Sequence, residues 1–178
     1  VAPPASPAET VKQSLIAVPD RREKTRALKH LIDTADVKNA FIFCNRKRDV
    51  GGLYRELTKG GYDAVQLHGD MVQSARTETL DKFKKGEARL LVCSDVAARG
   101  IDVQKVSHVF NYDVPSHAED YVHRIGRTGR AGQMGRAYTL ALPEDAKYVG
   151  AIEKMVGKPF DHEDLTGVAQ VALDEEAK

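Results

Sequence analysis

The chain has 178 residues, a length that suits one domain with its own hydrophobic core. Its apolar fraction of 42% and charged fraction of 30% are ordinary for a globular protein, and its formal net charge of +1 excludes a general polycation that binds nucleic acid through bulk charge. It contains no apolar run near the ~18 residues of a membrane span and no signal peptide, so we expect a soluble, cytoplasmic protein. Cys44 and Cys93 lie inside apolar runs and are expected to be buried free thiols, with a disulfide as the alternative.

Strand-like and helix-like segments alternate from residue 10 to residue 157. Residues 1–9 precede them and contain three prolines, which is typical of an extended linker and suggests that another domain comes before it. In chain order, the hydrophobic patterns predict strands at 11–18, 40–44, 63–67, 89–93, 106–112 and 137–142. Helices are predicted at 22–33, 50–59, 73–83, from about 117 to 125, and at 144–155.

This alternation predicts the fold class. Short strands that are apolar on both faces, each followed by an amphipathic helix, indicate an α/β domain with a mostly parallel sheet and helices on both faces. Ser116 and Glu119 have the spacing of a capping box before the fifth helix. Residues 158–178 are predicted to form an acidic C-terminal tail that is exposed to solvent, with a short helix as an option, since six acids face one lysine from 161 to 178.

Polar residues gather where the predicted strands end. In parallel sheets, ligands bind at the carboxyl ends of the strands, in the loops that lead into the helices. Residues 94–102 follow one strand and supply the Ser94 hydroxyl for a phosphate and the Asp102 carboxylate for a sugar hydroxyl pair, although a purely structural turn would use the same residues. Asn45 follows a second strand, and Arg76 opens the helix after a third, where backbone amides favour an anion. Asp70 and Gln73 have the spacing of a structural helix cap at that helix start.

The segment 121–132 carries arginines at every third position, Arg124, Arg127 and Arg130, together with three glycines and no acid. The glycines make a continuous helix unfavourable, so we expect a helix that ends at about Ile125 and continues as a Gly-rich loop. Guanidinium groups held in that way suit bidentate contact with phosphate oxygens, whereas the plainer interpretation is a solvated basic turn.

Several other site types lack their sequence patterns. There is no Gly-x-x-x-x-Gly-Lys-Ser/Thr loop, no Asp-Glu pair after a buried strand and no Gly-x-Gly-x-x-Gly, so this chain alone is not expected to hydrolyse a nucleoside triphosphate efficiently or to bind a dinucleotide. Arginines without a phosphate loop suggest fingers that complete a site on another domain. The six histidines form no ligand-spaced cluster with the cysteines, which argues against a metal site, and no serine sits in a nucleophile elbow.

Five short motifs in this sequence resemble those of one known protein family. Residues 123–130, His-Arg-Ile-Gly-Arg-Thr-Gly-Arg, resemble motif VI of the DEAD-box RNA helicases, which belong to superfamily 2. Residues 94–102 resemble their motif V, 41–45 their motif IV, 73–76 their Gln-x-x-Arg motif, and 110–115 the strand between motifs V and VI. The match runs in order from about residue 10 to 157. The chain therefore resembles the C-terminal RecA-like domain, a three-layer fold, of a bacterial-type DEAD-box protein whose N-terminal domain is not in this sequence.

The resemblance implies a role for each matched residue. Arg127 and Arg130 would be arginine fingers on ATP, Asp102 would contact its ribose, and Gly100 would allow close approach of the backbone. Mg²⁺ and the phosphates of ATP would be held by the N-terminal domain of the same parent chain. Further roles follow in the same way: RNA binding for Asn45, Gly69, Arg76 and Ser94, and coupling of the two domains for Arg99, His123 and Arg124. Ser94 departs from the pattern, because the family more often has threonine there, but it keeps the hydroxyl.

These observations predict half of an ATP-dependent RNA helicase that is inactive alone. RNA and ATP together would close the two domains, and bending of one strand would expel its partner. A standalone module that binds RNA or docks a partner, without an ATPase role, is the alternative, and a DNA helicase domain of the same superfamily is a third. The sequence names neither the RNA nor a protein partner.

Overall fold

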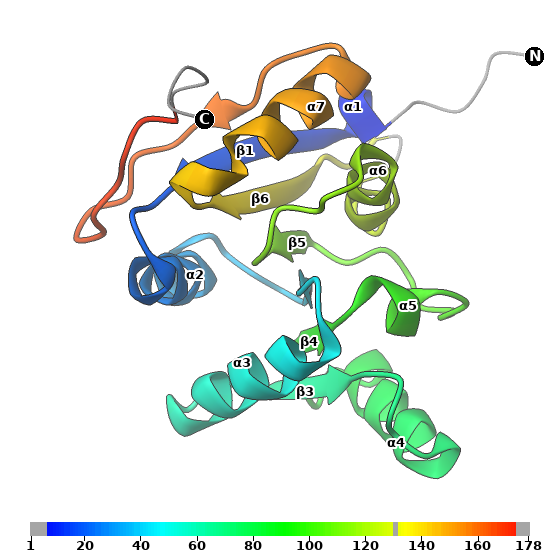
Figure 1. The fold of residues 1–178 in the computed structure, drawn as a ribbon. Helices are drawn as coiled ribbons and strands as arrows, with labels where there is room; N and C mark the ends of the chain where they lie inside the picture. The colour runs from blue at the N-terminus through cyan, green and yellow to red at the C-terminus, as the bar shows by residue number, and fades with distance from the viewer. Residues whose placement is uncertain (1–6, 130–131, 174–178) are drawn as a thin grey trace, which may run out of the picture.

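The computed structural model describes residues 7–129 and 132–173 as an α/β domain (Figure 1). Its elements, in chain order, are α1 (Pro7–Thr10), β1 (Val11–Ala17), α2 (Arg21–Thr34), β2 (Ala40–Phe43), α3 (Lys47–Lys59), β3 (Ala64–Leu67), α4 (Gln73–Lys84), β4 (Leu90–Cys93), α5 (Asp95–Ala98), β5 (His108–Asn111), α6 (Ala118–Ile125), β6 (Gly135–Ala141), the 3₁₀ helix η1 (Pro143–Asp145), α7 (Ala146–Val156) and β7 (Asp161–His162).

The strands form one sheet in the order β3-β4-β2-β5-β6-β1-β7, and every pairing between neighbouring strands is parallel. Side chains alternate between its two faces, as the two-residue period of a strand requires. In β2, Phe41 and Phe43 lie in one core, whereas Ala40 and Ile42 lie in the other. The predicted fold class is therefore confirmed.

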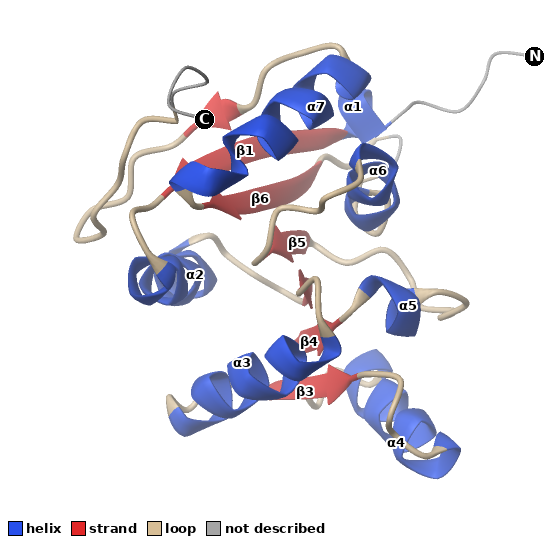
Figure 2. Ribbon diagram, viewed as in Figure 1, coloured by secondary structure: helices blue, strands red, loops and turns tan. Residues whose placement is uncertain are grey.

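Two hydrophobic cores cover the two faces of the sheet. The buried residues of α2 and α3 pack on one face, and those of α4, α5, α6 and α7 pack on the other (Figure 2). Cys44 and Cys93 are both buried and free, which confirms the prediction of buried thiols. Within the described ranges, no helix is both long enough and apolar enough to cross a membrane.

All predicted strands and helices are present, with shifted ends. The helix predicted from residue 50 begins at Lys47. The prediction missed its first turn because that turn is charged and lacks the apolar period of the remainder of α3. The strand predicted at 106–112 is shorter, and Val106 instead forms an isolated bridge with Thr128. The helix predicted to end at about Ile125 does end there.

Both predicted helix caps are wrong. Helix α6 begins at Ala118 with His117 as its N-cap and no side-chain hydrogen bond there, so Ser116 lies outside the cap position. The N-cap of α4 is Val72, also without a side-chain bond. Asp70 accepts a hydrogen bond from Lys47 at 3.1 Å instead, which ties the loop after β3 to the start of α3.

The ends of the described chain are more ordered than the sequence suggests. Of the predicted linker, residues 7–9 begin helix α1, whereas 1–6 lie outside the described residues. After α7, Phe160 is buried and its ring meets Tyr121 of α6 edge-on, with 5.5 Å between ring centroids. Strand β7 then pairs with β1, and the Val171 amide donates to the Ala17 carbonyl at 2.9 Å. Residues 160–171 therefore cover the otherwise open edge of β1, while several of them, such as Asp161 and Asp164, remain exposed to solvent.

Candidate functional site

The carboxyl ends of β2, β4 and β5 converge on one buried side chain, Arg124 of α6, which is 1% exposed. Its Nε and one terminal nitrogen donate to the two carboxylate oxygens of Asp95, both at 2.8 Å. The same terminal nitrogen donates to Asn45 Oδ1 at 2.6 Å, and the other donates to the Asp113 carbonyl at 2.8 Å and to Asn111 Oδ1 at 3.4 Å. The guanidinium therefore has a partner for each of its five N–H groups.

A second layer of contacts fixes this arginine cluster in place. The guanidinium lies over the Phe43 ring at 5.2 Å from its centroid. The Asp113 carboxylate accepts from the Asn45 amide at 2.9 Å and faces Lys24, 3.6 Å away, whose side chain is 2% exposed. Burial lowers the pKa of Lys24, and the neighbouring Asp113 charge acts in the opposite direction. Asn45, Asp95, Asn111, Asp113 and Arg124 thus form one network that joins three strand ends to α6.

The suggestion that the arginines of segment 121–132 complete a site on another domain does not fit Arg124, because its side chain is buried within this domain. One helix face of α6 buries Tyr121, Arg124 and Ile125 together. The spacing of these residues, one turn of a helix, was the signal in the sequence that could have revealed the burial. No sequence pattern assigns a role to Asp95 or Asp113, because only the fold brings them to the same arginine.

Arg127, one turn further along, lies at the surface. It is partly exposed and donates to the carbonyls of Ile101 at 3.1 Å and Ala98 at 2.6 Å, and its guanidinium lies 5.6 Å from the centre of the Phe41 ring. Arg130 lies outside the described residues. Arg127 therefore rests on the segment 98–101 and is free of any carboxylate partner within the part of the chain that the structure describes.

Arg99, His123 and Arg127 are brought together around a small depression of about 50 Å³, which Phe43, Asp95, Ala98, Asp120 and Arg124 also line. Arg99 and His123 are exposed. Gly100 follows α5 with φ +75°, and a Cβ there would meet no atom within 4 Å, so glycine is required by the backbone conformation and not by crowding inside this domain. Asp102 is exposed on the same loop.

The predicted RNA-binding residues lie at the carboxyl ends of three adjacent strands, β3, β4 and β2. Ser94 is buried as the N-cap of α5, and its Oγ accepts from the Ala97 amide at 3.4 Å, as the structural interpretation of this loop expected. The Asn45 side chain also donates to the Val114 carbonyl at 3.0 Å. Arg76 is partly buried and donates to the His68 carbonyl at 3.3 Å, and Gly69 is exposed beside it.

The thiols take no part in this site. Burial raises the pKa of Cys44 and of Cys93 well above the ordinary range of a thiol, so both remain protonated at neutral pH. Among the described residues, no group of three or more His, Cys, Asp or Glu side chains is placed to hold a metal ion.

Residues 23–132 match the family described as "Helicase conserved C-terminal domain". The ATP-dependent RNA helicase CshA of Listeria monocytogenes is 43% identical over 148 residues, which cover 83% of this chain and 28% of that relative. The ATP-dependent RNA helicase fal1 of Schizosaccharomyces pombe is 40% identical over 153 residues, which cover 86% of this chain and 39% of the relative. The chain thus spans between a quarter and two fifths of the length of these relatives.

Solved structures agree with this comparison. The E. coli DEAD-box protein SrmB, in a crystal structure with regulator of ribonuclease activity A, superposes with a TM-score of 0.86 at 33% identity, covering 91% of this chain and 95% of that one. The C-terminal domain of the DEAD-box protein Dbp5 superposes with a TM-score of 0.77 at 31% identity, covering 86% and 89% of the two chains. S. cerevisiae Dbp5 bound to RNA and ADP BeF3 gives 0.80 at 30% identity, where the match covers 89% of this chain and 44% of that one.

Proposed function

Since this chain belongs to the helicase C-terminal domain family, in its DEAD-box branch, we propose that it forms the second half of an ATP-dependent RNA helicase core. In this proposal, residues 10–157 work with an N-terminal RecA-like domain of the same parent protein. The sequence of this chain has no phosphate loop, so ATP and Mg²⁺ would be held by that other domain. The relatives it matches are ATP-dependent RNA helicases, which supports ATP and RNA as the ligands.

The observation that carries the proposal is the contrast between Arg124 and Arg127. Arg124 has used every donor inside the domain, whereas the hydrogen bonds of Arg127 in the described chain go to two carbonyls and its guanidinium lies over the Phe41 ring, beside the exposed Arg99 and His123. A cation that has no carboxylate partner at a domain surface is suited to reach a phosphate supplied from outside. We assign Arg127 and Arg130 as arginine fingers, and Arg99 and His123 as residues that couple the two domains on closure.

The loop after α5 is assigned to the ribose. Gly100 keeps the backbone there open to close approach, and Asp102 presents an exposed carboxylate that can accept from sugar hydroxyls. This carboxylate would act only when the other domain presents the nucleotide.

RNA would lie along the carboxyl ends of β2, β3 and β4. Arg76 supplies the charge for a phosphate, the Ser94 hydroxyl one hydrogen bond, and the backbone near Asn45 and Gly69 further contacts, with the Asn45 side chain occupied by Arg124. Contacts of this kind read the sugar-phosphate backbone and give little sequence preference. We place this work in the cytoplasm, where two free thiols remain reduced.

The decisive experiment measures RNA-stimulated ATP hydrolysis by the two-domain protein and its Arg127→Ala variant. We expect the rate to fall by about 10³-fold or more, with RNA association changed little, because the finger acts on the transition state. Lys85→Ala, which removes an exposed cation at the end of α4, is the matched control and should keep the full rate. An unchanged rate in Arg127→Ala, or strong hydrolysis by this chain alone, would contradict the proposal.

A further inference from the structure

A cavity of about 380 Å³ opens at the end of the sheet that lies opposite the candidate site, where the strands begin. Its walls come from the residues before or at the start of β2, β5 and β6, which are neighbours in the sheet, so the cavity lies at the amino ends of the strands. The residues assigned to RNA lie at the carboxyl ends. A volume of this size is within the range of small-molecule pockets, which runs from about 300 to 1,000 Å³.

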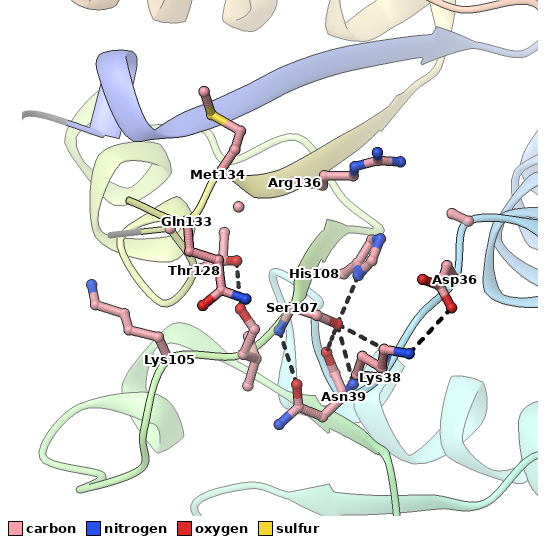
Figure 3. A pocket seen from close by; sticks show the side chains of 14 residues that line it. Asp36, Lys38, Asn39, Lys105, Ser107, His108, Thr128, Gln133, Met134 and Arg136 are labelled. Carbon is pink, nitrogen blue, oxygen red and sulfur yellow. Dashed lines mark hydrogen bonds and ion pairs between the residues drawn. The ribbon is translucent and has the colours of Figure 1, made fainter. Parts of the chain in front are cut away.

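The cavity wall is cationic. Lys38, Lys105 and Arg136 line it, against the single acid Asp36, which lies 3.5 Å from Lys38 (Figure 3). Lys105 donates to the Gly126 carbonyl, and within residues 7–129 and 132–173 neither Lys105 nor Arg136 is paired with a carboxylate. Since cations without acid partners attract oxyanions, the charge of the wall favours an anionic ligand.

A buried histidine in the same wall has an unpartnered atom. His108 is 4% exposed, and its ring stacks near Phe110 and Tyr138 with centroids 6.0 Å and 6.2 Å away. Its Nδ1 atom lies 2.8 Å from Ser107 Oγ, but Nε2 has no hydrogen-bond partner among the described residues. Figure 3 shows the Arg136 side chain on the side of the ring away from Ser107. Buried polar atoms nearly always have a partner, so this atom is open to a water molecule or to a bound ligand.

We propose that this cavity binds the phosphoryl group of a small phosphorylated molecule at Arg136 and His108, with Lys38 and Lys105 as further cations of the cavity wall. Guanidinium and ammonium groups are the usual phosphate partners, and the cavity has room for a phosphoryl group with a small organic body. The site is joined to the candidate site by the Lys105 side chain, which donates to the Gly126 carbonyl, and by the backbone of Val106. The Val106 amide donates to the Arg127 carbonyl at 2.9 Å, so a ligand here would touch the segment that carries this arginine.

Binding should take up a proton. Ser107 Oγ donates to the Asn39 carbonyl at 2.8 Å and lies 2.8 Å from His108 Nδ1. On this ground we assign the proton of the neutral ring to Nδ1, which leaves Nε2 as an acceptor. An oxyanion at Nε2 needs a donor, and hence the imidazolium. In the unliganded domain burial lowers the pKa of His108 to about 4, with Arg136 acting in the same direction and the Ala35 carbonyl and Asp36 in the other. A bound dianion would raise this pKa, so affinity increases as the pH falls.

The test is an NMR titration of this chain with inorganic phosphate and with glycerol 3-phosphate, following the amides of residues 105–108 and the His108 ring. We expect both probes to shift these signals, with tighter binding of glycerol 3-phosphate if the ligand has an organic body. Arg136→Ala removes an exposed side chain and should weaken binding about tenfold, the usual loss when one charge-assisted hydrogen bond is removed. His108→Phe keeps the stacking and should weaken it as well.

Lys59→Ala is the control, because Lys59 is an exposed cation at the end of α3 outside the cavity, and its removal should change nothing. Sulfate, which stays a dianion across the relevant range, should bind up to about tenfold more tightly for each pH unit below neutral in the wild type but not in His108→Phe. The proposal fails if neither probe shifts residues 105–108, if Lys59→Ala weakens binding as much as Arg136→Ala, or if only RNA with a 5′-phosphate shifts these residues.

Discussion

Buried polar side chains are satisfied to different extents at the carboxyl ends and at the amino ends of the strands. At the carboxyl ends of the strands, Arg124 is 1% exposed and has a partner for every N–H group, with Asp95 as its ion pair. At the amino ends, His108 is buried to a similar degree but keeps one ring nitrogen without a partner in the described chain. The first edge is complete within the domain and serves as a rigid support. The second is incomplete, and it is where we place an unassigned ligand.

The largest effect is expected for Arg124→Ala. The substitution leaves the Asp95 carboxylate and the Asn45 side chain without their cation, and breaking one partner of a buried ion pair costs about 3–5 kcal/mol of the free energy of unfolding. At this chain length the melting temperature should fall by about 2–4 °C for each kcal/mol. Urea and thermal unfolding of the isolated chain measure the loss.

Arg124→Lys and Arg99→Ala sharpen this first prediction. Lysine keeps the charge but offers three donors in place of a planar fork of five, so it should recover only a small part of the loss. Arg99 is exposed, and its removal should change the free energy of unfolding by no more than about 0.5 kcal/mol. If Arg124→Ala lowered the free energy of unfolding less than Arg99→Ala, Arg124 would not be what stabilises the carboxyl ends of the strands.

The next effect concerns pH and the incomplete edge. The folded-state pKa of His108 is lowered to about 4 from an ordinary value near 6.5, because burial disfavours the charged ring. Between these two values the unfolded chain binds more protons than the folded one, so stability is fully present above about pH 6.5 and is lost as the pH falls toward 4. The loss should approach roughly 3 kcal/mol, at about 1.4 kcal/mol for each unit of pKa difference.

His108→Phe separates this contribution from other groups that titrate in the same window. The phenyl ring can stack as the imidazole does between Phe110 and Tyr138, but it takes no proton. The stability of the wild type relative to this variant should therefore decrease from pH 7 to pH 4, as measured by urea unfolding. Parallel pH curves for the two proteins would show that the ring is not held neutral by burial.

A smaller loss is expected for Ser107→Ala. The Ser107 hydroxyl accepts from the amides of Lys38 and Asn39 at 3.0 and 3.2 Å and donates to the Asn39 carbonyl, so it joins the loop before β2 to the start of β5. Its removal leaves these partly buried groups unpaired at a cost of about 1–2 kcal/mol. Ser116→Ala is the matched control, since Ser116 is exposed and has no hydrogen bond within the described residues. If the two substitutions had equal effects, the Ser107 hydroxyl would not be what holds the loop before β2 to the start of β5.

Much of the fold could be predicted from the sequence because its signals are local. Apolar runs such as residues 40–43 form buried strands, and this can be predicted without knowing the order of the strands in the sheet. Helix α6 likewise ends at Ile125, where the glycines begin. Strand β7 could not be predicted, because its two polar residues, Asp161 and His162, become a strand only through pairing with β1, far away in the sequence. The caps at Ser116 and Asp70 failed because capping depends on where the helix starts to within one residue.

The candidate site could be predicted only in part. Arginines near strand ends were visible, but the sequence does not show that Asp95 and Asp113 meet Arg124 across three strands. The cavity at the amino ends was missed altogether. Lys38, Lys105 and Arg136 are isolated cations along the chain, and they share a wall only because β2, β5 and β6 are adjacent in the sheet.

Arg127→Ala should destabilise the domain less than Arg124→Ala or Ser107→Ala, and it is the most informative of these variants about function. Arg127 is only partly buried, and the carbonyls of Ala98 and Ile101 that it leaves can bind water, so the free energy of unfolding should fall by about 1 kcal/mol or less. Urea unfolding of this variant beside Arg124→Ala compares two arginines one helical turn apart. If Arg127→Ala were as destabilising as Arg124→Ala, a loss of ATP hydrolysis in the two-domain protein would follow from a damaged fold, and the finger assignment would lose its support. If the domain stays folded while hydrolysis is lost, the function of Arg127 lies outside its own domain, because the only contacts it loses within the domain are weak ones.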